Sequence, residues 1–201
     1  MKLYYSPGAC SLASHIALTE TGLPFEIESV DLGKKLTKSG ADFKRVNPKG
    51  QVPCLETQSG ENLSEGSAIL QYIADRAPEK DLAPRNGTFE RYRLQEWLNY
   101  VATEVHKGFS PLWNPQIKEE AKAAAITNLS RKFDWLETEL QTRPFLMGQQ
   151  FTVADAYLFT VLSWSKVLKM EMTKWQHLMG YLERVSARPS VKTTLKAEGL
   201  L

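Results

Sequence analysis

The sequence predicts a small α/β domain followed by an all-helical domain. Short apolar runs and helical patterns alternate up to about residue 76, whereas helical periods without a convincing strand continue from Thr88 to the end. The stretch between the two patterns is rich in proline, glycine and charged residues, which is typical of a linker. We therefore expect a first domain at 1–77, a linker at 78–87 and a helical domain at 88–201.

The opening of the chain places a cysteine between a strand and a helix. Residues 3–5 form a short apolar run, Pro7-Gly8 interrupts it, and a helical pattern begins at Leu12. Cys10 is thus expected at the first turn of a helix, where free N–H groups and the helix dipole favour a thiolate. No acidic residue comes before Glu20 to oppose this effect. The alternative reading is an inert, buried thiol.

Further strands are predicted on both sides of a proline. Residues 25–30 alternate with period two, which predicts a strand with one buried face that pairs in parallel with the first. Residues 31–40 are polar without a strong period and indicate a loop or a short helix. Residues 54–63 have the pattern of a hairpin, and Pro53 stands where its first strand begins.

A second helix is expected after this hairpin. Ser64 is suited to be its N-cap, with Glu65 and Ser67 in the first turn. The N–H groups of such a turn can hold a carboxylate or another anion. The commoner use of a serine at this position is plain capping.

Five helices are expected in the second half. They span about 88–108, 118–140, 154–168, 174–187 and 190–197. Thr152 and Asp155 have the spacing of a capping box, and Phe151 stands where a hydrophobic staple would contact Ala156. We interpret this segment as folding chemistry and not as catalysis.

A polar stripe runs along the first of these helices. Asn99, Thr103, His106 and Lys107 have spacings that place them on one face of an α-helix. That face either points to solvent or points into a cleft between domains. In a cleft, His106 and Lys107 would lower the pKa of a thiol or donate hydrogen bonds to a ligand.

Composition excludes several classes of protein. Hydrophobic residues make up 42% and charged residues 24%, with a formal net charge of +2, as in an ordinary soluble globular protein. The basic residues are scattered, so no nucleic-acid partner is expected. No apolar run has the length of a transmembrane helix, and the opening lacks a signal-peptide pattern. We predict no membrane partner and no metal site. Cys10 and Cys54 are expected as thiols in a reducing cytoplasm.

Together these motifs resemble the cytosolic glutathione transferases, and specifically their bacterial beta class. The resemblance covers essentially the whole chain. It rests on segments that occur in the same order along the sequence, namely 2–12, 47–53, 65–66, 96–100, 104–108 and 151–159.

The resemblance implies a thioredoxin-like first domain, a helical second domain, a homodimer and a cis Val52–Pro53 bond. It implies glutathione as a co-substrate and no cofactor. The residues that it assigns to glutathione binding are Tyr5, Cys10, Lys35, Gln51, Val52, Pro53, Glu65, Gly66, Asn99, Thr103, Glu104, Val105 and His106.

The resemblance also places Cys10 at the sulfur of glutathione, with His106 and Lys107 as polar groups near that sulfur. Other classes use a tyrosine or a serine to donate a hydrogen bond to the thiolate, and Tyr5 and Ser11 stand near those positions. We favour Cys10 because the beta-class pattern is the closest. Candidates for the electrophile pocket, whose aromatic members would equally suit a core, are Phe109, Pro111, Leu112, Trp113, Tyr157 and Trp164.

The leading hypothesis is therefore a cytoplasmic transferase that conjugates glutathione to hydrophobic electrophiles, as in detoxification, with a cysteine able to form a mixed disulfide with glutathione. A second hypothesis is a glutathione-dependent thiol–disulfide oxidoreductase or dehalogenase. Pro7 occupies the position that a Cys-x-x-Cys pair would need, which argues against a dithiol cycle. A third is a non-catalytic ligand-binding protein on the same fold.

Overall fold

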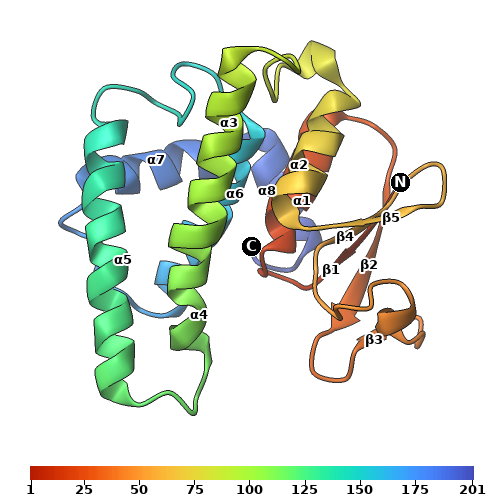
Figure 1. Ribbon diagram of the computed structural model, residues 1–201, viewed down its shortest axis with the longest axis horizontal. Coiled ribbons are helices and arrows are strands. Elements are labelled where there is room, and N and C mark those ends of the chain that lie inside the picture. Colours follow the sequence, from red (N-terminus) through yellow and green to blue (C-terminus); the bar gives the residue numbers. More distant parts are fainter. The chain divides into compact units, whose positions relative to one another are not determined.

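The computed structural model describes residues 1–201, which form two compact units. One unit comprises Met1–Ala83 together with Ala187–Leu201, and the other comprises Pro84–Ser186. Figure 1 shows every strand in the first unit, whereas the second is built from helices. The grouping of residues 187–201 with the first unit differs from the expected helical domain at 88–201, and the division at 78–87 stays a prediction.

A five-stranded mixed sheet forms the centre of the first unit, with the strand order β3-β2-β1-β4-β5. The strands are β1 (Lys2–Tyr5), β2 (Glu26–Asp31), β3 (Leu36–Thr37), β4 (Cys54–Glu56) and β5 (Asn62–Ser64). β1 pairs in parallel with β2 and antiparallel with β4, and β4 and β5 form the expected hairpin. The interpretation of 31–40 as a loop or short helix was wrong in part, because Leu36 and Thr37 pair with the end of β2.

The strand β2 does not bury the face that its alternation predicts. Ile27 is 36% exposed, whereas Val30 is buried. Val30 belongs to a hydrophobic cluster with Tyr4, Phe43 and Cys54. This cluster therefore joins residues that lie far apart in the sequence. The alternation of residues in one strand does not reveal such a cluster.

Three helices complete the first unit: α1 (Ser11–Thr21), α2 (Gly66–Asp75) and α8 (Pro189–Ala197). α1 packs against both α2 and α8. Gly22 ends α1 in the left-handed conformation, with φ of 70°, as its position after the helical pattern predicts. α8 comes from the far end of the sequence and supplies Val191 and Thr194 as fully buried residues.

The second unit contains α3 (Phe89–Tyr100), α4 (Lys107–Trp113), α5 (Glu119–Leu140), α6 (Val153–Val167) and α7 (Gln176–Ser186). These helices agree with the expected ones to within a few residues, except that the helix expected at 88–108 is not a continuous α-helix. Residues Val101–His106 form a π-helical segment between α3 and α4. None of the helices in the molecule combines the length and apolar character needed to cross a membrane.

The capping box at the start of α6 is confirmed. The side chain of Thr152 accepts from the backbone of Asp155, and the Asp155 carboxylate accepts from the Thr152 N–H at 2.8 Å. The same carboxylate accepts from the Leu146 N–H at 2.8 Å and from the Tyr181 hydroxyl at 3.2 Å. Burial raises the pKa of Asp155 to about 6, and these hydrogen bonds oppose that rise.

Candidate functional site

Cys10 lies at the start of α1, as the sequence predicts. It is the residue that precedes the helix, and its side chain is partly buried. Its Sγ donates a hydrogen bond to the carbonyl oxygen of Val52 at 3.2 Å. Two segments separated by about forty residues thus meet at this thiol, and the N–H groups of the first turn of α1 lie beside it.

Ser11 holds the turn that carries Cys10. Its Oγ donates to the carbonyl of Ser6 at 3.2 Å and accepts from the Ser6 N–H at 3.1 Å. The residue is fully buried. A hydroxyl engaged in this way fixes the backbone between β1 and α1, which agrees with the interpretation of Ser11 as a residue of the helix start.

An acidic residue that the sequence did not reveal reaches the same turn. Glu198 accepts a hydrogen bond from the Gly8 N–H at 2.9 Å, and its other oxygen lies 2.8 Å from His15 Nδ1. The lack of acidic residues before Glu20 in the sequence therefore does not keep a carboxylate away from the turn before α1. No local motif could have found Glu198, because it lies 190 residues after Gly8.

Tyr5 is buried beside this network. Its ring centroid lies 5.8 Å from that of His15, and only 8% of the residue is exposed. Burial raises the pKa of the Tyr5 hydroxyl, and the nearby charge of Glu198 raises it further. The phenol therefore stays protonated at neutral pH, and its burial fits the interpretation of a packed wall.

The loop before β4 contains the second predicted group of site residues. The Val52–Pro53 bond is cis, as the resemblance implies. The Asn47 amide donates to the carbonyl of Gln51 at 2.7 Å, and Lys35 Nζ donates to the carbonyl of Gly50 at 2.9 Å. Lys35 is thus brought to this loop.

The start of α2 differs from the prediction. Ser64 belongs to β5 and is not the N-cap, because Glu65 precedes the helix and makes no side-chain capping bond. Glu65 has φ of 73°, a left-handed conformation that costs a residue with a Cβ about 1–3 kcal/mol. Its carboxylate lies 2.6 Å from Lys49 Nζ in an exposed ion pair and makes no capping hydrogen bond to the backbone of α2.

The polar stripe of the second unit is divided by the π-helical segment. Asn99, Thr103 and Lys107 are exposed, and the Thr103 hydroxyl donates to the carbonyl of Asn99 at 3.0 Å. His106 does not share their environment, because it is turned toward buried aromatic residues. The wider turn of a π-helix changes which residues share a face, so the α-helical spacing of the prediction does not apply across Val101–His106.

His106 is a neutral imidazole at pH 7. Burial, and to a lesser extent the charge of Lys107, lowers its pKa to about 4. Its Nδ1 lies 2.7 Å from the Tyr157 hydroxyl, and its ring lies 5.0 Å from that of Trp164. His106 can exchange hydrogen bonds with a ligand, but it carries no positive charge that would lower the pKa of a thiol.

Four of the candidate electrophile-pocket residues come together around His106. Trp164 contacts the ring of Phe109 at 5.5 Å and that of Trp113 at 5.9 Å, and Tyr157 contacts His106. Trp113 is 46% exposed, whereas Phe109, Tyr157 and Trp164 are buried. Pro111 and Leu112 are half-buried on α4. The cluster therefore combines a core with one exposed aromatic ring.

A cavity of about 710 Å³ lies between the π-helical segment and α5. Its lining includes Thr103, Glu104 and Lys107. Glu104 forms an ion pair with Lys132 of α5, within its own chain. The neighbouring Val105 is fully buried.

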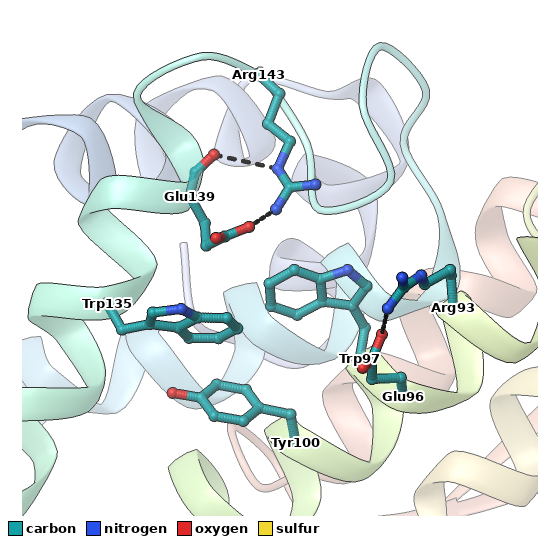
Figure 2. A pocket seen from close by; sticks show the side chains of 7 residues that line it. All are labelled: Arg93, Glu96, Trp97, Tyr100, Trp135, Glu139 and Arg143. Carbon is teal, nitrogen blue, oxygen red and sulfur yellow. Dashed lines mark hydrogen bonds and ion pairs between the residues drawn. The ribbon is translucent and has the colours of Figure 1, made fainter.

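A second cavity of the helical unit, about 620 Å³, contains none of the predicted site residues. Figure 2 shows the rings of Trp97, Tyr100 and Trp135 gathered in this pocket, with the Arg93–Glu96 and Arg143–Glu139 ion pairs at its edge. The indoles of Trp97 and Trp135 are stacked at 5.2 Å. Tyr100 and Trp135 line this cavity and the 710 Å³ cavity alike.

The second cysteine, Cys54, is not part of the candidate site. Cys54 is 1% exposed in β4, and burial raises the pKa of its thiol to about 11. It is therefore protonated and unreactive at neutral pH. No group of three or more histidine, cysteine or acidic side chains is arranged to hold a metal ion.

Comparisons with known proteins converge on one family. Residues 1–75 match the family model described as the glutathione S-transferase N-terminal domain, and residues 100–189 match that of the C-terminal domain. The glutathione S-transferase GstA of Escherichia coli O157:H7 is 48% identical over 200 residues, which cover both chains completely.

Solved structures agree with this assignment. A bacterial beta class glutathione S-transferase of Sphingomonas chungbukensis is 48% identical, with a TM-score of 0.97 and full coverage of both chains. A sphingomonad glutathione S-transferase complexed with glutathione is 47% identical, with the same TM-score and coverage.

Proposed function

Because the chain belongs to the glutathione S-transferase family, we propose that it transfers glutathione to hydrophobic electrophiles and that Cys10 stands at the reacting sulfur. The observation that carries the role of Cys10 is its hydrogen bond to Val52. The resemblance assigns the main chain of Val52 to glutathione binding. The Cys10 thiol is therefore hydrogen-bonded to a main-chain group that the resemblance assigns to glutathione.

This hydrogen bond links the protonation state of Cys10 to the binding of glutathione. A thiol donates to the Val52 carbonyl, whereas a thiolate cannot, so loss of the proton from Cys10 frees that oxygen to accept an N–H of glutathione. The first turn of α1 favours the thiolate by its dipole. Binding of glutathione and activation of Cys10 are thus expected to support each other.

Two reactions are open to this site. In conjugation, the sulfur of glutathione forms a bond to an electrophilic carbon, the leaving group departs with its electron pair, and the thiol proton passes to water. In thiol exchange, the Cys10 thiolate attacks one sulfur of a disulfide and the other sulfur leaves as a thiolate. Thiol exchange is the reaction that the oxidoreductase alternative would use. Cys54 takes no part in it, because it is buried and protonated.

Other contacts to glutathione remain proposals that rest on the resemblance. In the first unit these are Tyr5, Lys35, Gln51, Val52, Pro53, Glu65 and Gly66. In the second they are Asn99, Thr103, Glu104, Val105 and His106, with Lys107 as a further polar group. The position of Glu65 and Gly66 at the N-terminus of α2, where the helix dipole favours an anion, supports their role for a carboxylate. A homodimer and a cytoplasmic location are proposed on the same ground.

The test replaces Cys10 with alanine and measures two rates. For Cys10→Ala, the mixed disulfide with glutathione should be lost completely, and conjugation to a model aromatic halide should fall about 10²-fold because the thiolate is no longer activated. Cys54→Ala is the control and should retain both activities.

The possible outcomes separate the hypotheses. Full conjugation in Cys10→Ala, with loss of thiol exchange alone, would show that Cys10 does not activate glutathione. A faster reaction of the unaltered protein with a mixed disulfide of glutathione than with the aromatic halide would favour the oxidoreductase. Tight binding of glutathione by the unaltered protein, with no turnover on a panel of electrophiles and disulfides, would favour a ligand-binding protein.

A further inference from the structure

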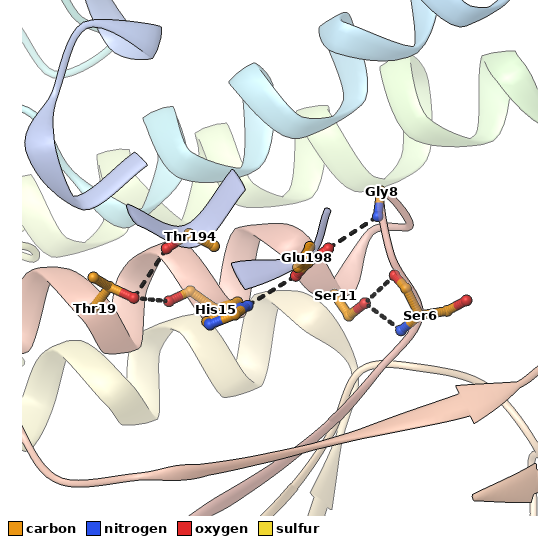
Figure 3. A network of polar contacts seen from close by, with 7 residues as sticks. All are labelled: Ser6, Gly8, Ser11, His15, Thr19, Thr194 and Glu198. Atoms are coloured by element: carbon orange, nitrogen blue, oxygen red, sulfur yellow. Dashed lines mark hydrogen bonds and ion pairs between the residues drawn. The ribbon is translucent and has the colours of Figure 1, made fainter. Parts of the chain in front are cut away.

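The end of the chain folds back onto the turn that precedes Cys10. Figure 3 shows Glu198 between Gly8 and His15, with its two oxygens directed at different partners. Glu198 is 6% exposed and His15 is 2% exposed. A carboxylate accepts hydrogen bonds only, so His15 donates from Nδ1 and the Gly8 N–H donates from the backbone. A buried charge with two donors is strongly held in position.

The local structure at the end of α8 explains how Glu198 is presented. Gly199 has φ of +72°, which a glycine adopts without strain. The Leu200 N–H donates to the carbonyl of Leu195 at 2.8 Å, and the Gly199 N–H donates to that of Lys196 at 3.1 Å. These two bonds form a Schellman motif, which ends the helix and fixes the direction of the residues around it.

Leu200 also lies close to Gly8. A Cβ placed on Gly8 would lie 3.5 Å from Cδ2 of Leu200. That distance is an ordinary van der Waals contact, so it is the φ of +70°, and not a lack of space, that favours glycine at this position. The end of α8 thus holds Gly8 by the hydrogen bond to Glu198 and places Leu200 close to it.

From these contacts we propose that Glu198 is a positioning residue for Cys10. It acts through the N–H of Gly8, two residues before the cysteine, while Ser11 fixes the other end of the same turn through Ser6. The carboxylate also holds His15, one turn further along α1. The placement of the Cys10 thiol against Val52 depends on this turn. The inference rests on the proposed function only in taking Cys10 as the reacting thiol.

The experiment compares three variants of the full-length protein. Glu198→Ala removes both hydrogen bonds. Glu198→Gln keeps them, because an amide oxygen accepts from Gly8 and an amide N–H can donate to the other tautomer of His15. Arg188→Ala is the matched control. It removes a different contact between α8 and α1, in which Arg188 Nε lies 2.6 Å from the Glu20 carboxylate at the opposite end of α1.

The readout is the rate at which Cys10 forms a mixed disulfide with glutathione disulfide, located by peptide mass. In this step the Cys10 thiolate attacks one sulfur, the disulfide bond breaks, and a glutathione thiolate leaves. Thermal unfolding of each variant is measured alongside. We expect Glu198→Ala to react about tenfold more slowly, because a small misplacement of a reacting group is costly. Glu198→Gln and Arg188→Ala should stay within about threefold of the unaltered protein.

The comparison separates positioning from stability. If Glu198→Ala and Arg188→Ala lose similar thermal stability and react at the same rate as the unaltered protein, Glu198 only anchors α8 and the proposal is wrong. A slow Glu198→Gln would also overturn it, because the hydrogen bond to Gly8 is kept. If conjugation in Cys10→Ala remains complete, the proposed role of Cys10 in conjugation fails, yet the mixed-disulfide rates still test the role of Glu198.

Discussion

His106 shows how the environment of one side chain decides its chemistry. The imidazole packs among aromatic rings and hydrogen-bonds the Tyr157 hydroxyl, and burial lowers its pKa to about 4. In an unfolded chain the pKa would be about 6.5. The unfolded state therefore binds more protons than the folded state between these two values. Stability from this residue is complete above about pH 6.5 and is lost as the pH falls toward 4.

We predict that replacing His106 with glutamine reduces the acid sensitivity of the protein. The difference in unfolding free energy between the two proteins should change by on the order of 2 kcal/mol between pH 7 and pH 4, after allowance for partial exposure. Urea unfolding at several pH values measures it. Asp155, whose raised pKa acts in the opposite direction, is present in both proteins and cancels. An imidazole NMR titration with a midpoint near 6.5 for His106 would contradict the prediction.

At the residue scale, the sequence was informative where the chemistry is local. Cys10 at the helix start follows from the strand, the Pro7-Gly8 break and the helical pattern. Glu198 could not be found in this way, because only the fold brings it to Gly8. His106 was placed on the wrong face because the spacing argument assumed an α-helix where the chain forms a π-helix.

At the scale of elements, α6 is the clearest example of a helix specified by its own first turn. Thr152 and Asp155 satisfy each other's backbone, and Asp155 also accepts from Leu146 and Tyr181. The carboxylate thus joins the start of α6 to the preceding loop and to α7. The sequence predicted the capping box, but it gave no signal for the second pair of contacts.

We predict that the two capping residues differ in their contribution to stability. Thr152→Ala should cost about 1–2 kcal/mol, the usual loss for an N-cap. Asp155→Ala should cost about 3–5 kcal/mol, because it leaves several buried donors without a partner. Thr127→Ala, at an exposed position of α5, is the control and should change stability by less than about 0.5 kcal/mol. Urea unfolding followed by far-UV circular dichroism measures all three, and equal losses for Thr152 and Asp155 would show that the outer contacts are unimportant.

The boundaries of other elements were predicted less well, for identifiable reasons. β3 has only two residues, and its pairing with β2 gives no periodic pattern in the sequence. Ser64 has the composition of an N-cap but pairs in the sheet, and the strained Glu65 precedes the helix instead. A strained residue at such a position points to a function, because the conformational preference of the backbone alone would favour a glycine there.

At the scale of the whole molecule, the change from an alternating pattern to a helical one predicted the two kinds of architecture correctly. What it could not show is that the last helix belongs with the first unit. The periodicity of α8 is that of any amphipathic helix. Its partners are Glu20, Thr19 and Gly8, all near the other end of the chain.

This arrangement predicts where a C-terminal deletion acts. Removal of residues 187–201 should loosen the first unit, because α1 loses a packing partner and the buried Val191 and Thr194 are lost with it. Amide hydrogen exchange measured by mass spectrometry should rise in α1 and β1, with little change in α5 and α6. Deletion of the exposed Leu201 alone is the control and should leave exchange unchanged. Equal increases in both units would mean that they unfold as one cooperative body, and an increase confined to the helical unit would mean that α8 contributes to the stability of that unit instead.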